Sequence, residues 1–592
     1  MPHHNRSSRR RMALAIVCVL AVVGAFIVRL VDIQVVQADQ LRAVAASKTA
    51  DQSTVYGARG EIVDTNGNVL AGSVTRYDIV LDPLNAKPFT RTDDGGASVT
   101  VSVEQAAAEI GAITGSTGAE IQALIADALA VNPESRYAVA AKTLDVDDFQ
   151  AVRALKIPWV GSQKHPGRIY PNGAVGGNVI GFVGSDGTPL QGLEQAQNDC
   201  LASINGTQTF KKGKDGVILP GTTQTIVDAK NGGTLKLTID RDLQWFAQQR
   251  IAEQVIATGG DSGTVTIMDA KTGKIRAVAQ YPSVDPGNVG GIDEYYRQAL
   301  SFTAPFEPGS TFKALTAAML IDAGLATPES KVVADGWFYP DNGARIKDSI
   351  PHGPMKLTLT GVLAESSNTG ISQMGEALTP QQRYDYLKKF GIGDVTAVGF
   401  DAESGGILSQ PDVWDNQTYY ATMFGQGLSA TPIQIASAYQ ALANGGVQVA
   451  PSLIEGCEHD DGSITDVPSA SEKRVVSEQA ADEVVQMLES VVTDGHFGDT
   501  LQIPGYRVAA KSGTAEQGDG SGGLKDTYVV SMTGMAPAED PEYVVSVHIS
   551  NPTKIRSSAA AAPTFQQIMT QVLKTYRIEP STEPSPDLPT TY

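Results

Sequence analysis

A single long apolar run near the start of the chain limits how the rest can fold. Residues 12–28 hold no charged side chain, and the eleven residues before them contain four arginines and no acidic residue. If Arg29 reaches to the interface, the run extends to residue 31 and is long enough for a helix to cross a bilayer. We therefore expect a transmembrane anchor over residues 12–31, a helical stalk over residues 30–48, and a body that folds in water.

The arginines within residues 1–11 predict the orientation of this anchor. A basic cluster before an apolar segment favours a cytoplasmic tip, so the body is expected on the outer side of the cell membrane. A cleaved signal peptide is the alternative, but its apolar core is normally shorter and ends at a small-residue cleavage site. Lipid attachment at Cys18 is not expected, because Val17 stands where lipoprotein signals have a small residue.

Composition constrains the body and its partners. The chain of 592 residues is 42% hydrophobic and 19% charged, which is typical of a folded protein with several domains. Its 45 basic and 65 acidic residues give a net charge of −20, which argues against nucleic acid as a partner, because phosphate binding needs a basic surface. Cys200 and Cys457 would face an oxidising space, but they are far apart and expected in different domains, so the sequence does not predict that they pair.

Local patterns divide the body near residue 230. In the first part, Asn66-Gly67 between alternating residues predicts a β-hairpin. Helices are expected over residues 103–114 and 118–132. In the second part, residues 231–577, a strand over residues 234–240 leads into a helix over residues 241–256.

The end of the chain predicts a sheet, a helix and a tail. Strand patterns are followed by a helical pattern in an order that suits an antiparallel sheet packed by helices. The strands are expected over residues 506–514, 527–535 and 543–550, and the helix over residues 559–576. Residues 578–592 contain four prolines and three acidic residues without a basic one, so we expect them to form a disordered tail.

The segment beginning at Ser310 carries the clearest chemical signal. Residues 310–321 are apolar on nearly every face, which predicts a buried helix, and Lys313 is their only charged residue. Lys313 follows Ser310 by three residues and so shares its helical face. Burial favours the neutral form of lysine, which can act as a base toward a neighbouring hydroxyl. The structural alternative is that Ser310 caps the helix and Lys313 reaches to solvent.

Two short motifs follow in the chain. Ser366-Ser367-Asn368 interrupts two helical stretches, and Lys511-Ser512-Gly513-Thr514 ends a predicted strand. Either motif alone is compatible with an ordinary turn or strand end. In this order after Ser310 and Lys313, they match the serine, Ser-x-Asn and Lys-Thr-Gly elements of the penicillin-binding enzymes.

The chain as a whole resembles the class B penicillin-binding proteins, which are membrane-anchored D,D-transpeptidases that cross-link peptidoglycan. It is most similar to their septal cell-division type in high-GC Gram-positive bacteria. Ser512 departs from the threonine of many members but keeps the hydroxyl group. The resemblance covers almost the whole chain and includes Arg59-Gly60, Arg168-Ile169-Tyr170-Pro171, Gly181-Phe182-Val183-Gly184, Gly192-Leu193-Glu194, Thr238-Ile239-Asp240, Phe306-Glu307-Pro308-Gly309 and Phe424-Gly425-Gln426-Gly427-Leu428.

This resemblance implies an α/β fold of the penicillin-binding transpeptidase type. Residues 231–577 would form an antiparallel sheet flanked by helices, with a helical subdomain. Residues 48–230 would form an elongated α+β pedestal of the dimerisation type, connected to the one N-terminal transmembrane helix. Because the pedestal accounts for the residues before the transpeptidase domain, the glycan polymerase is expected to be a separate membrane protein.

The resemblance also implies roles for the first two motifs. Ser310 attacks the carbonyl between the two terminal D-alanines of a stem peptide and forms an acyl-enzyme, while Lys313 takes the proton of Ser310. Ser366 relays a proton toward the leaving amine. Asn368 holds the amide of the donor peptide and the head group of Lys313.

The third motif is implied to bind the donor peptide. Lys511 lies on the strand whose edge the donor follows, with the hydroxyls of Ser512 and Thr514 at the donor carboxylate. Gly513 lets the peptide backbone approach. The backbone N–H groups of Ser310 and Thr514 form the oxyanion hole.

Neither a metal nor a nucleotide is expected as a cofactor, because the chain has no His-Glu-x-x-His zinc signature and no P-loop. One Gly-x-Gly-x-x-Gly, residues 518–523, leads into a strand rather than a helix, so we interpret it as a loop at the edge of the cleft. The partners implied are peptidoglycan stem peptides, β-lactams, a separate membrane glycosyltransferase and other division proteins.

The sequence leaves three alternatives open. Within class B, the protein could serve elongation rather than division. A D,D-carboxypeptidase or β-lactam hydrolase would share the nucleophile, but no Glu-x-x-Leu-Asn run follows Ser366, and Asn368 stands where another lactamase class has valine. A non-catalytic divisome scaffold would not need the intact Ser310 and Lys313.

Overall fold

The computed structural model describes residues 6–592 except residues 33, 35–36, 38–49, 93–94, 212, 214–217, 401 and 519–523. The chain forms two compact units, one of Met1–Gly57 with Ser203–Asn231 and one of Ala58–Ala202 with Gly232–Tyr592. The predicted stalk over residues 30–48 and the glycine-rich loop over residues 518–523 lie mostly outside the described residues.

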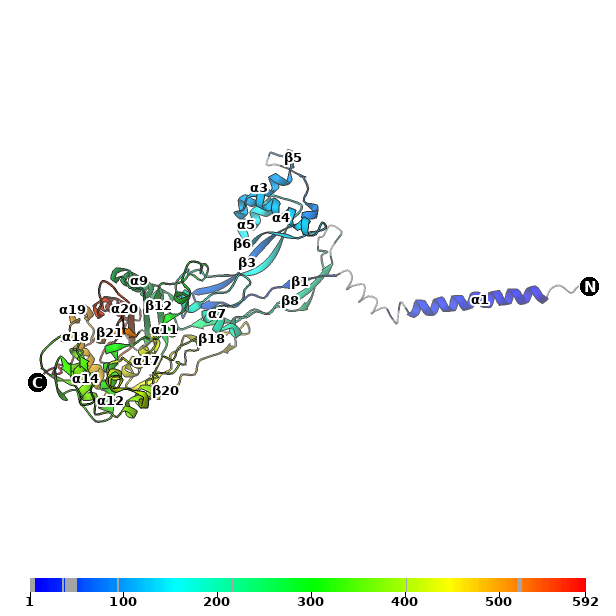
Figure 1. Cartoon of the computed structure of the whole chain (residues 1–592). Helices are drawn as coiled ribbons and strands as arrows, with labels where there is room; N and C mark the ends of the chain where they lie inside the picture. The colour runs from blue at the N-terminus through cyan, green and yellow to red at the C-terminus, as the bar shows by residue number, and fades with distance from the viewer. Residues whose placement is uncertain are drawn as a thin grey trace, which may run out of the picture. The chain divides into compact units, whose positions relative to one another are not determined.

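The first unit contains the predicted anchor. Helix α1 (Arg6–Val31) is the blue helix in Figure 1, and its residues 10–31 are long and apolar enough to cross a membrane. Its apolar side chains are exposed, as suits contact with lipid. The unit also contains an antiparallel sheet of β1 (Ala50–Val55), β8 (Gly206–Lys211) and β9 (Gln224–Val227), in the order β1-β8-β9.

A seven-stranded sheet begins the second unit, in the order β19-β18-β10-β2-β3-β6 with β7 also paired to β3. Its strands are β2 (Ile62–Val63), β3 (Val69–Leu81), β6 (Ala138–Leu144), β7 (Val160–Ile169), β10 (Thr234–Leu237), β18 (Ile454–Glu458) and β19 (Ile464–Thr465). The predicted hairpin is present, because β2 and β3 pair antiparallel across a turn in which Gly67 has a φ of 82°. Strand β10 pairs in parallel with β2, so residues on both sides of the predicted boundary near residue 230 share one sheet.

Two capped helices form the core of a small helical layer on this sheet. Helix α3 (Val103–Thr114) begins after Ser102, whose side chain accepts from the third backbone N–H, and ends at Gly115 in the left-handed conformation. Helix α4 (Gly118–Val131) begins with a capping box of Thr117 and Glu120. Both helices confirm the prediction. They pack with α5 (Val146–Ala154), the 3₁₀ turn η2 (Pro83–Asn85) and the hairpin of β4 (Phe89–Thr92) and β5 (Ser98–Val101).

Three of the family-like motifs meet at one buried carboxylate. Glu194, in α7 (Gly192–Ala196), is fully buried and accepts from Arg59 Nε and Arg168 Nε at 2.7 Å each. Arg168 also donates to the carbonyl of Gly60 at 2.6 Å. Two guanidinium groups compensate the cost of burying this carboxylate, and removal of both would leave an uncompensated buried charge.

An antiparallel five-stranded sheet forms the second part of this unit, in the order β12-β11-β23-β22-β21. Its strands are β11 (Ser262–Asp269), β12 (Ile275–Tyr281), β21 (Ala509–Gly518), β22 (Leu524–Ala536) and β23 (Tyr543–Ser550). Helices α9 (Arg241–Thr258) and α20 (Ala562–Thr575) pack on one face, and α17 (Pro432–Ala443) and α18 (Glu478–Thr493) on the other. The predicted transpeptidase-type fold, an antiparallel sheet flanked by helices, is confirmed.

A helical subdomain adjoins this sheet and contributes to the largest core cluster. Its helices are α12 (Phe312–Asp322), α13 (Leu359–Ala364), α14 (Asn368–Gly375), α15 (Pro380–Lys389) and α16 (Asn416–Ala421). Short strand pairs accompany them: β13 (Lys331–Ala334) with β16 (Met355–Thr358), β14 (Trp337–Phe338) with β15 (Ile346–Lys347), and β17 (Val447–Val449) with β20 (Glu472–Arg474). The remaining short helices are α6 (Gly177–Ile180), α8 (Asn198–Leu201), α10 (Glu294–Arg297), α11 (Leu300–Thr303), α19 (Gly498–Leu501), η3 (Gly309–Thr311), η4 (Pro411–Val413), η5 (Thr422–Phe424) and η6 (Ser558–Ala560).

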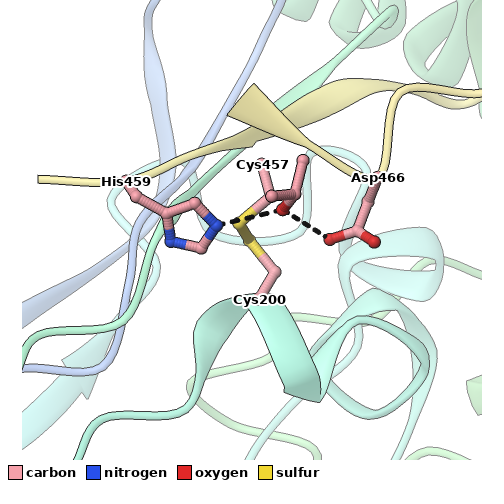
Figure 2. Close-up of a disulfide and its surroundings, with 5 residues drawn as sticks. Cys200, Cys457, His459 and Asp466 are labelled. Atoms are coloured by element: carbon pink, nitrogen blue, oxygen red, sulfur yellow. Dashed lines mark hydrogen bonds between the residues drawn. A yellow bond between two sulfur atoms is a disulfide. The ribbon is translucent and has the colours of Figure 1, made fainter. Parts of the chain in front are cut away.

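Cys200 and Cys457 form a disulfide, which the sequence does not predict. Figure 2 shows Cys200 on α8 bonded to Cys457 on β18, and both residues are buried. The chain brings them together through β10, because Leu235 pairs with Cys457 and the N–H of Gly233 donates to the carbonyl of Cys200 at 2.8 Å. Beside the disulfide, Thr465 Oγ1 lies 3.0 Å from His459 Nε2 and donates to Asp466 Oδ2 at 2.9 Å.

The tail over residues 578–592 is ordered, so the prediction of disorder is wrong. The N–H of Ser581 donates to the carbonyl of Gly505 at 2.9 Å. Further along, Thr358 donates through its N–H to the carbonyl of Thr590 and through its hydroxyl to the carbonyl of Pro589. Leu588 packs against the large core cluster. These contacts use backbone carbonyls and one leucine, so a proline-rich and acidic composition does not reveal them.

Candidate active site

Ser310 lies in the short turn η3, directly before α12. The preceding Gly309 has a φ of 62°, and its N–H donates to the carbonyl of Gly425 at 2.9 Å. A side chain at position 309 would also come within 3.0 Å of the carbonyl of Thr514 on β21. Glycine therefore lets the turn fit between β21 and the 425 loop, which places Ser310 beside both.

Lys313 is fully buried one turn after Ser310. Its Nζ lies 2.9 Å from Ser310 Oγ and 3.2 Å from Ser366 Oγ, and it donates to the carbonyl of Ser366 at 2.6 Å. A neutral amine can donate two hydrogen bonds and accept one, so this set of partners suits an unprotonated Lys313 that accepts the proton of Ser310.

Ser366 connects the two buried lysines. Its hydroxyl accepts from Lys511 Nζ at 3.0 Å as well as contacting Lys313. It follows the end of α13 with a φ of 57°, a conformation that is uncommon for a residue other than glycine. The predicted trio of Ser310, Lys313 and Ser366 is thus joined to Lys511 by a continuous chain of hydrogen bonds.

The charges of the two lysines influence each other. Burial, followed by the positive charge of Lys511, holds the pKa of Lys313 well below its usual range, while the negative charge of Asp348 raises it. Burial lowers the pKa of Lys511 to about 7. In the part of the chain that the structure describes, neither amine forms an ion pair with a carboxylate, so no direct carboxylate contact offsets the loss of solvation on burial.

The third motif lies on β21, as predicted for Lys511, Ser512, Gly513 and Thr514. Lys511 Nζ lies 3.3 Å from both the carbonyl and the hydroxyl oxygen of Ser512. A Cβ atom at Gly513 would lie 2.3 Å from Ser531 Oγ and 2.9 Å from the carbonyl of Pro308. Glycine therefore serves the packing of β21 against the turn that carries Ser310, in addition to any approach by a substrate.

Thr514 is exposed, and a residue without a sequence signal supports it. Thr514 Oγ1 lies 3.0 Å from the hydroxyl of Ser558, which donates to the carbonyl of Gly513 at 2.8 Å. Ser558 lies 44 residues after Thr514, in a run of alanines and serines that matches no catalytic pattern.

Asn368 has a different partner from the one that the resemblance implies. Its Nδ2 donates to the carbonyl of Lys347 at 2.9 Å rather than to the Lys313 head group. Asn368 is the first residue of α14, and its N–H faces the carboxylate of Asp348. Sequence reasoning also missed Asp348, because it lies in an irregular segment between two short strands.

Metal ligands do not gather in this site. Among the residues that the structure describes, no group of three or more histidine, cysteine, aspartate or glutamate side chains could hold a metal ion. The site is instead built from two lysines, hydroxyl groups and one strand edge. This arrangement suits nucleophilic attack on a carbonyl and general acid–base catalysis.

Comparisons with known proteins agree with this geometry. Residues 263–570 match the penicillin-binding protein transpeptidase domain, and residues 54–237 match the penicillin-binding protein dimerisation domain. The penicillin-binding protein PbpB of Mycobacterium tuberculosis is 33% identical over 98% of this chain and 87% of its own length. The peptidoglycan D,D-transpeptidase FtsI of Escherichia coli K12 is 30% identical over 96% of this chain and 92% of its own.

Solved structures agree as well. A peptidoglycan synthetase from Bifidobacterium adolescentis has a TM-score of 0.71 at 28% identity and covers 92% of this chain and 100% of that chain. Penicillin-binding protein 3 from Mycobacterium tuberculosis, complexed with ampicillin, has a TM-score of 0.70 at 28% identity and covers 91% of this chain and 100% of that chain.

Proposed function

Because this chain belongs to the class B penicillin-binding proteins and is a peptidoglycan D,D-transpeptidase, we propose that Ser310 forms the acyl-enzyme through which it cross-links stem peptides. The observation that carries this assignment is the hydrogen-bonded chain from Ser310 through Lys313 and Ser366 to Lys511. It gives the nucleophile a buried base and gives the leaving group a source of protons.

Acylation follows from these contacts. Ser310 Oγ attacks the carbonyl carbon between the terminal D-alanines while its proton moves to Lys313 Nζ. When the carbon–nitrogen bond breaks, Ser366 donates its proton to the leaving amine and regains one from Lys313, which is then neutral again, and D-alanine departs. An amine from a second stem peptide then attacks the ester carbonyl and loses its proton to Lys313. The bond from the carbonyl carbon to Ser310 Oγ breaks, Ser310 takes this proton from Lys313, and the cross-link is formed.

Strand β21 is suited to hold the donor peptide. It is the last strand of the sheet order, with β22 on one side only, so among the described strands its other edge has no partner. An extended peptide can add to such an edge through backbone hydrogen bonds. The hydroxyls of Ser512 and Thr514 and the charge of Lys511 would receive its carboxylate. Backbone N–H groups of Ser310 and Thr514 would stabilise the oxyanion, a contribution of about 3 kcal/mol.

The relatives named PbpB and FtsI support a role in septal wall synthesis during cell division. The apolar helix α1 fits a membrane anchor, and the arginines before it support a cytoplasmic tip and an external body. The polymerase that makes the glycan strands would be a separate membrane glycosyltransferase, and other division proteins would assemble with the transpeptidase.

Localisation of a tagged protein in growing cells distinguishes a role in division from a role in elongation. Midcell bands are expected, whereas lateral or polar signal would contradict a role in division.

Labelling with a fluorescent penicillin tests the nucleophile. The full chain in detergent is expected to be labelled covalently, and Ser310→Ala is expected to abolish labelling. Ser469→Ala, at an exposed position, is the matched control and should be labelled like the wild type. Undiminished labelling of Ser310→Ala would show that another residue is the nucleophile.

A further inference from the structure

The carboxylate of Asp348 lies beside the second motif and contacts its last two residues and the residue that follows them. Asp348 Oδ1 accepts from the backbone N–H of Asn368 at 2.5 Å and of Thr369 at 3.0 Å. Asp348 Oδ2 accepts from the hydroxyl of Ser367 at 2.7 Å and of Thr369 at 3.3 Å. The side chain of Asp348 is only 7% exposed, so water competes little for these bonds.

These contacts fix the backbone directly after Ser366. Asn368 and Thr369 begin α14, and their N–H groups have no acceptor within the helix. A carboxylate at this end satisfies them and is favoured by the helix dipole. Ser367 also caps α14 by accepting from the N–H of Gly370 at 2.9 Å. Because Ser366 itself has a left-handed backbone, its position between the lysines depends on its neighbours being held.

His352 holds the carboxylate from the other side. Its Nε2 lies 2.9 Å from Asp348 Oδ2, and its Nδ1 lies 2.7 Å from the carbonyl of Gly353. A neutral imidazole has one N–H, so donation to both oxygens requires the doubly protonated ring. The hydrogen bond to Gly353, and then the one to Asp348, raise the pKa of His352 accordingly.

We propose that Asp348 is a positioning residue for the acyl transfer, which holds Ser366 between Lys313 and Lys511 and places a negative charge where it acts on the buried amine of Lys313. The inference rests on the proposed function of Ser310 and the two lysines. It gives a part in the reaction to the segment between β15 and β16, which lies outside the three motifs.

The charge of Asp348 has an effect separate from its hydrogen bonds. The charged groups that act on Lys313 are Lys511 from β21 and Asp348 from the segment before β16, and they act in opposite directions. Around Asp348 itself, the charged groups are His352, which contacts it, and Asp335, whose charge also acts on His352. Removal of the negative charge should therefore lower the pKa of Lys313 further, whereas a change of shape alone should not.

The pH dependence of acylation tests the proposal. The second-order rate constant for a fluorescent penicillin would be measured on the full chain in detergent from pH 5 to pH 9, with thermal unfolding as a check of folding. Asp348→Asn is expected to slow acylation at least tenfold at neutral pH and to move the acid limb of the profile to lower pH. Asp348→Glu keeps the charge with a longer reach, so it should slow the reaction while the acid limb stays in place.

Asp341→Asn is the matched control, because it removes the same charge from an exposed residue of the preceding loop. It should acylate like the wild type at every pH. Wild-type acylation rates in Asp348→Asn would overturn the proposal, and so would equal losses in Asp348→Asn and Asp348→Glu without a shift of the acid limb. If Ser310→Ala still abolishes labelling in the same experiment, only this inference fails and the proposed function stands.

Discussion

At the residue scale, the burial of Lys511 opposes stability and favours reactivity. Among the described residues, its ammonium group contacts only hydroxyl and carbonyl oxygens, and its pKa falls to about 7 on folding. A lysine in this state can lend positive charge to a bound carboxylate or exchange a proton with Ser366 near neutral pH. The same burial makes the folded state less favourable than it would be with an apolar side chain.

Lys511→Met is therefore expected to abolish acylation and to stabilise the fold. Between about pH 7 and pH 10.5 the unfolded state binds more protons than the folded state at this lysine, so the stability of the wild type rises with pH across this window. The variant lacks this rise, so its advantage is largest near pH 7, with an upper limit of about 5 kcal/mol, and disappears toward pH 10.5.

Denaturant unfolding of both proteins at several pH values measures this difference. Lys473→Met, at an exposed position, is the control and should change neither stability nor its pH dependence. A Lys511→Met protein that is less stable than the wild type at pH 7 would show that the hydrogen bonds of Lys511 outweigh the cost of its burial.

The site residues differ in how far the sequence could predict them. Lys313 stands out because a lone cation in an apolar helix is costly unless it is used, and Ser310 and Lys511 stand out by their motifs and the order of those motifs. Asp348 and Ser558 do not stand out, because aspartate and serine are common in loops and their partners lie far away in the sequence. The chemical type of the site residues and the order of their motifs can be read from the sequence, whereas a hydrogen bond between residues far apart in the sequence cannot.

At the scale of elements, regular structure could be predicted where its pattern is local. The helices α3 and α4 and the hairpin of β2 and β3 follow from caps, hydrophobic spacing and the Asn66-Gly67 turn. The tail could not be predicted in this way. Its contacts to α13 and β16 are made by carbonyls of residues 589 and 590, which any sequence supplies.

The position of the tail explains why residue 361 in α13 is a glycine. A Cβ atom at Gly361 would lie 1.9 Å from the carbonyl oxygen of Thr590, so the tail can cross the helix only where a side chain is missing. Gly361→Ala is therefore expected to destabilise the full chain by about 1–3 kcal/mol. In a chain that lacks residues 588–592, the clash is gone and alanine should stabilise the helix by up to about 1 kcal/mol.

Denaturant unfolding of the full and truncated chains, each with and without Gly361→Ala, measures whether the effect of the substitution on stability changes sign. The truncation alone should destabilise the chain, because two hydrogen bonds of Thr358 and the burial of Leu588 are lost. Equal losses from Gly361→Ala in the full and truncated chains would mean that the tail does not press on α13 in solution.

At the scale of the whole molecule, the second unit joins segments that lie far apart in the sequence. Ser310, Ser366 and Lys511 meet at one site, and the sheet that contains β2 also contains β10 and β18. A boundary near residue 230 therefore separates sequence motifs but does not separate two sheets. The disulfide between Cys200 and Cys457 closes this arrangement covalently across 257 residues.

The disulfide gives a prediction about stability and compartment together. A body outside the membrane should be oxidised, so the denatured and unreduced protein should have one free thiol, that of Cys18. The double variant Cys200→Ser, Cys457→Ser should lose about 2–4 kcal/mol of stability, because its unfolded chain is no longer closed into a loop. Acylation by a fluorescent penicillin should stay within about twofold of the wild-type rate, since neither cysteine contributes an atom to the site.

Thiol titration, denaturant unfolding and penicillin labelling of the same preparations test each part. Cys18→Ser is the matched control, because it removes the one cysteine outside the disulfide and should leave stability unchanged. Three free thiols in protein isolated from membranes would contradict an oxidised external body. An unchanged stability with one free thiol would mean instead that the packing of β10 between α8 and β18 already holds the two halves of the unit together.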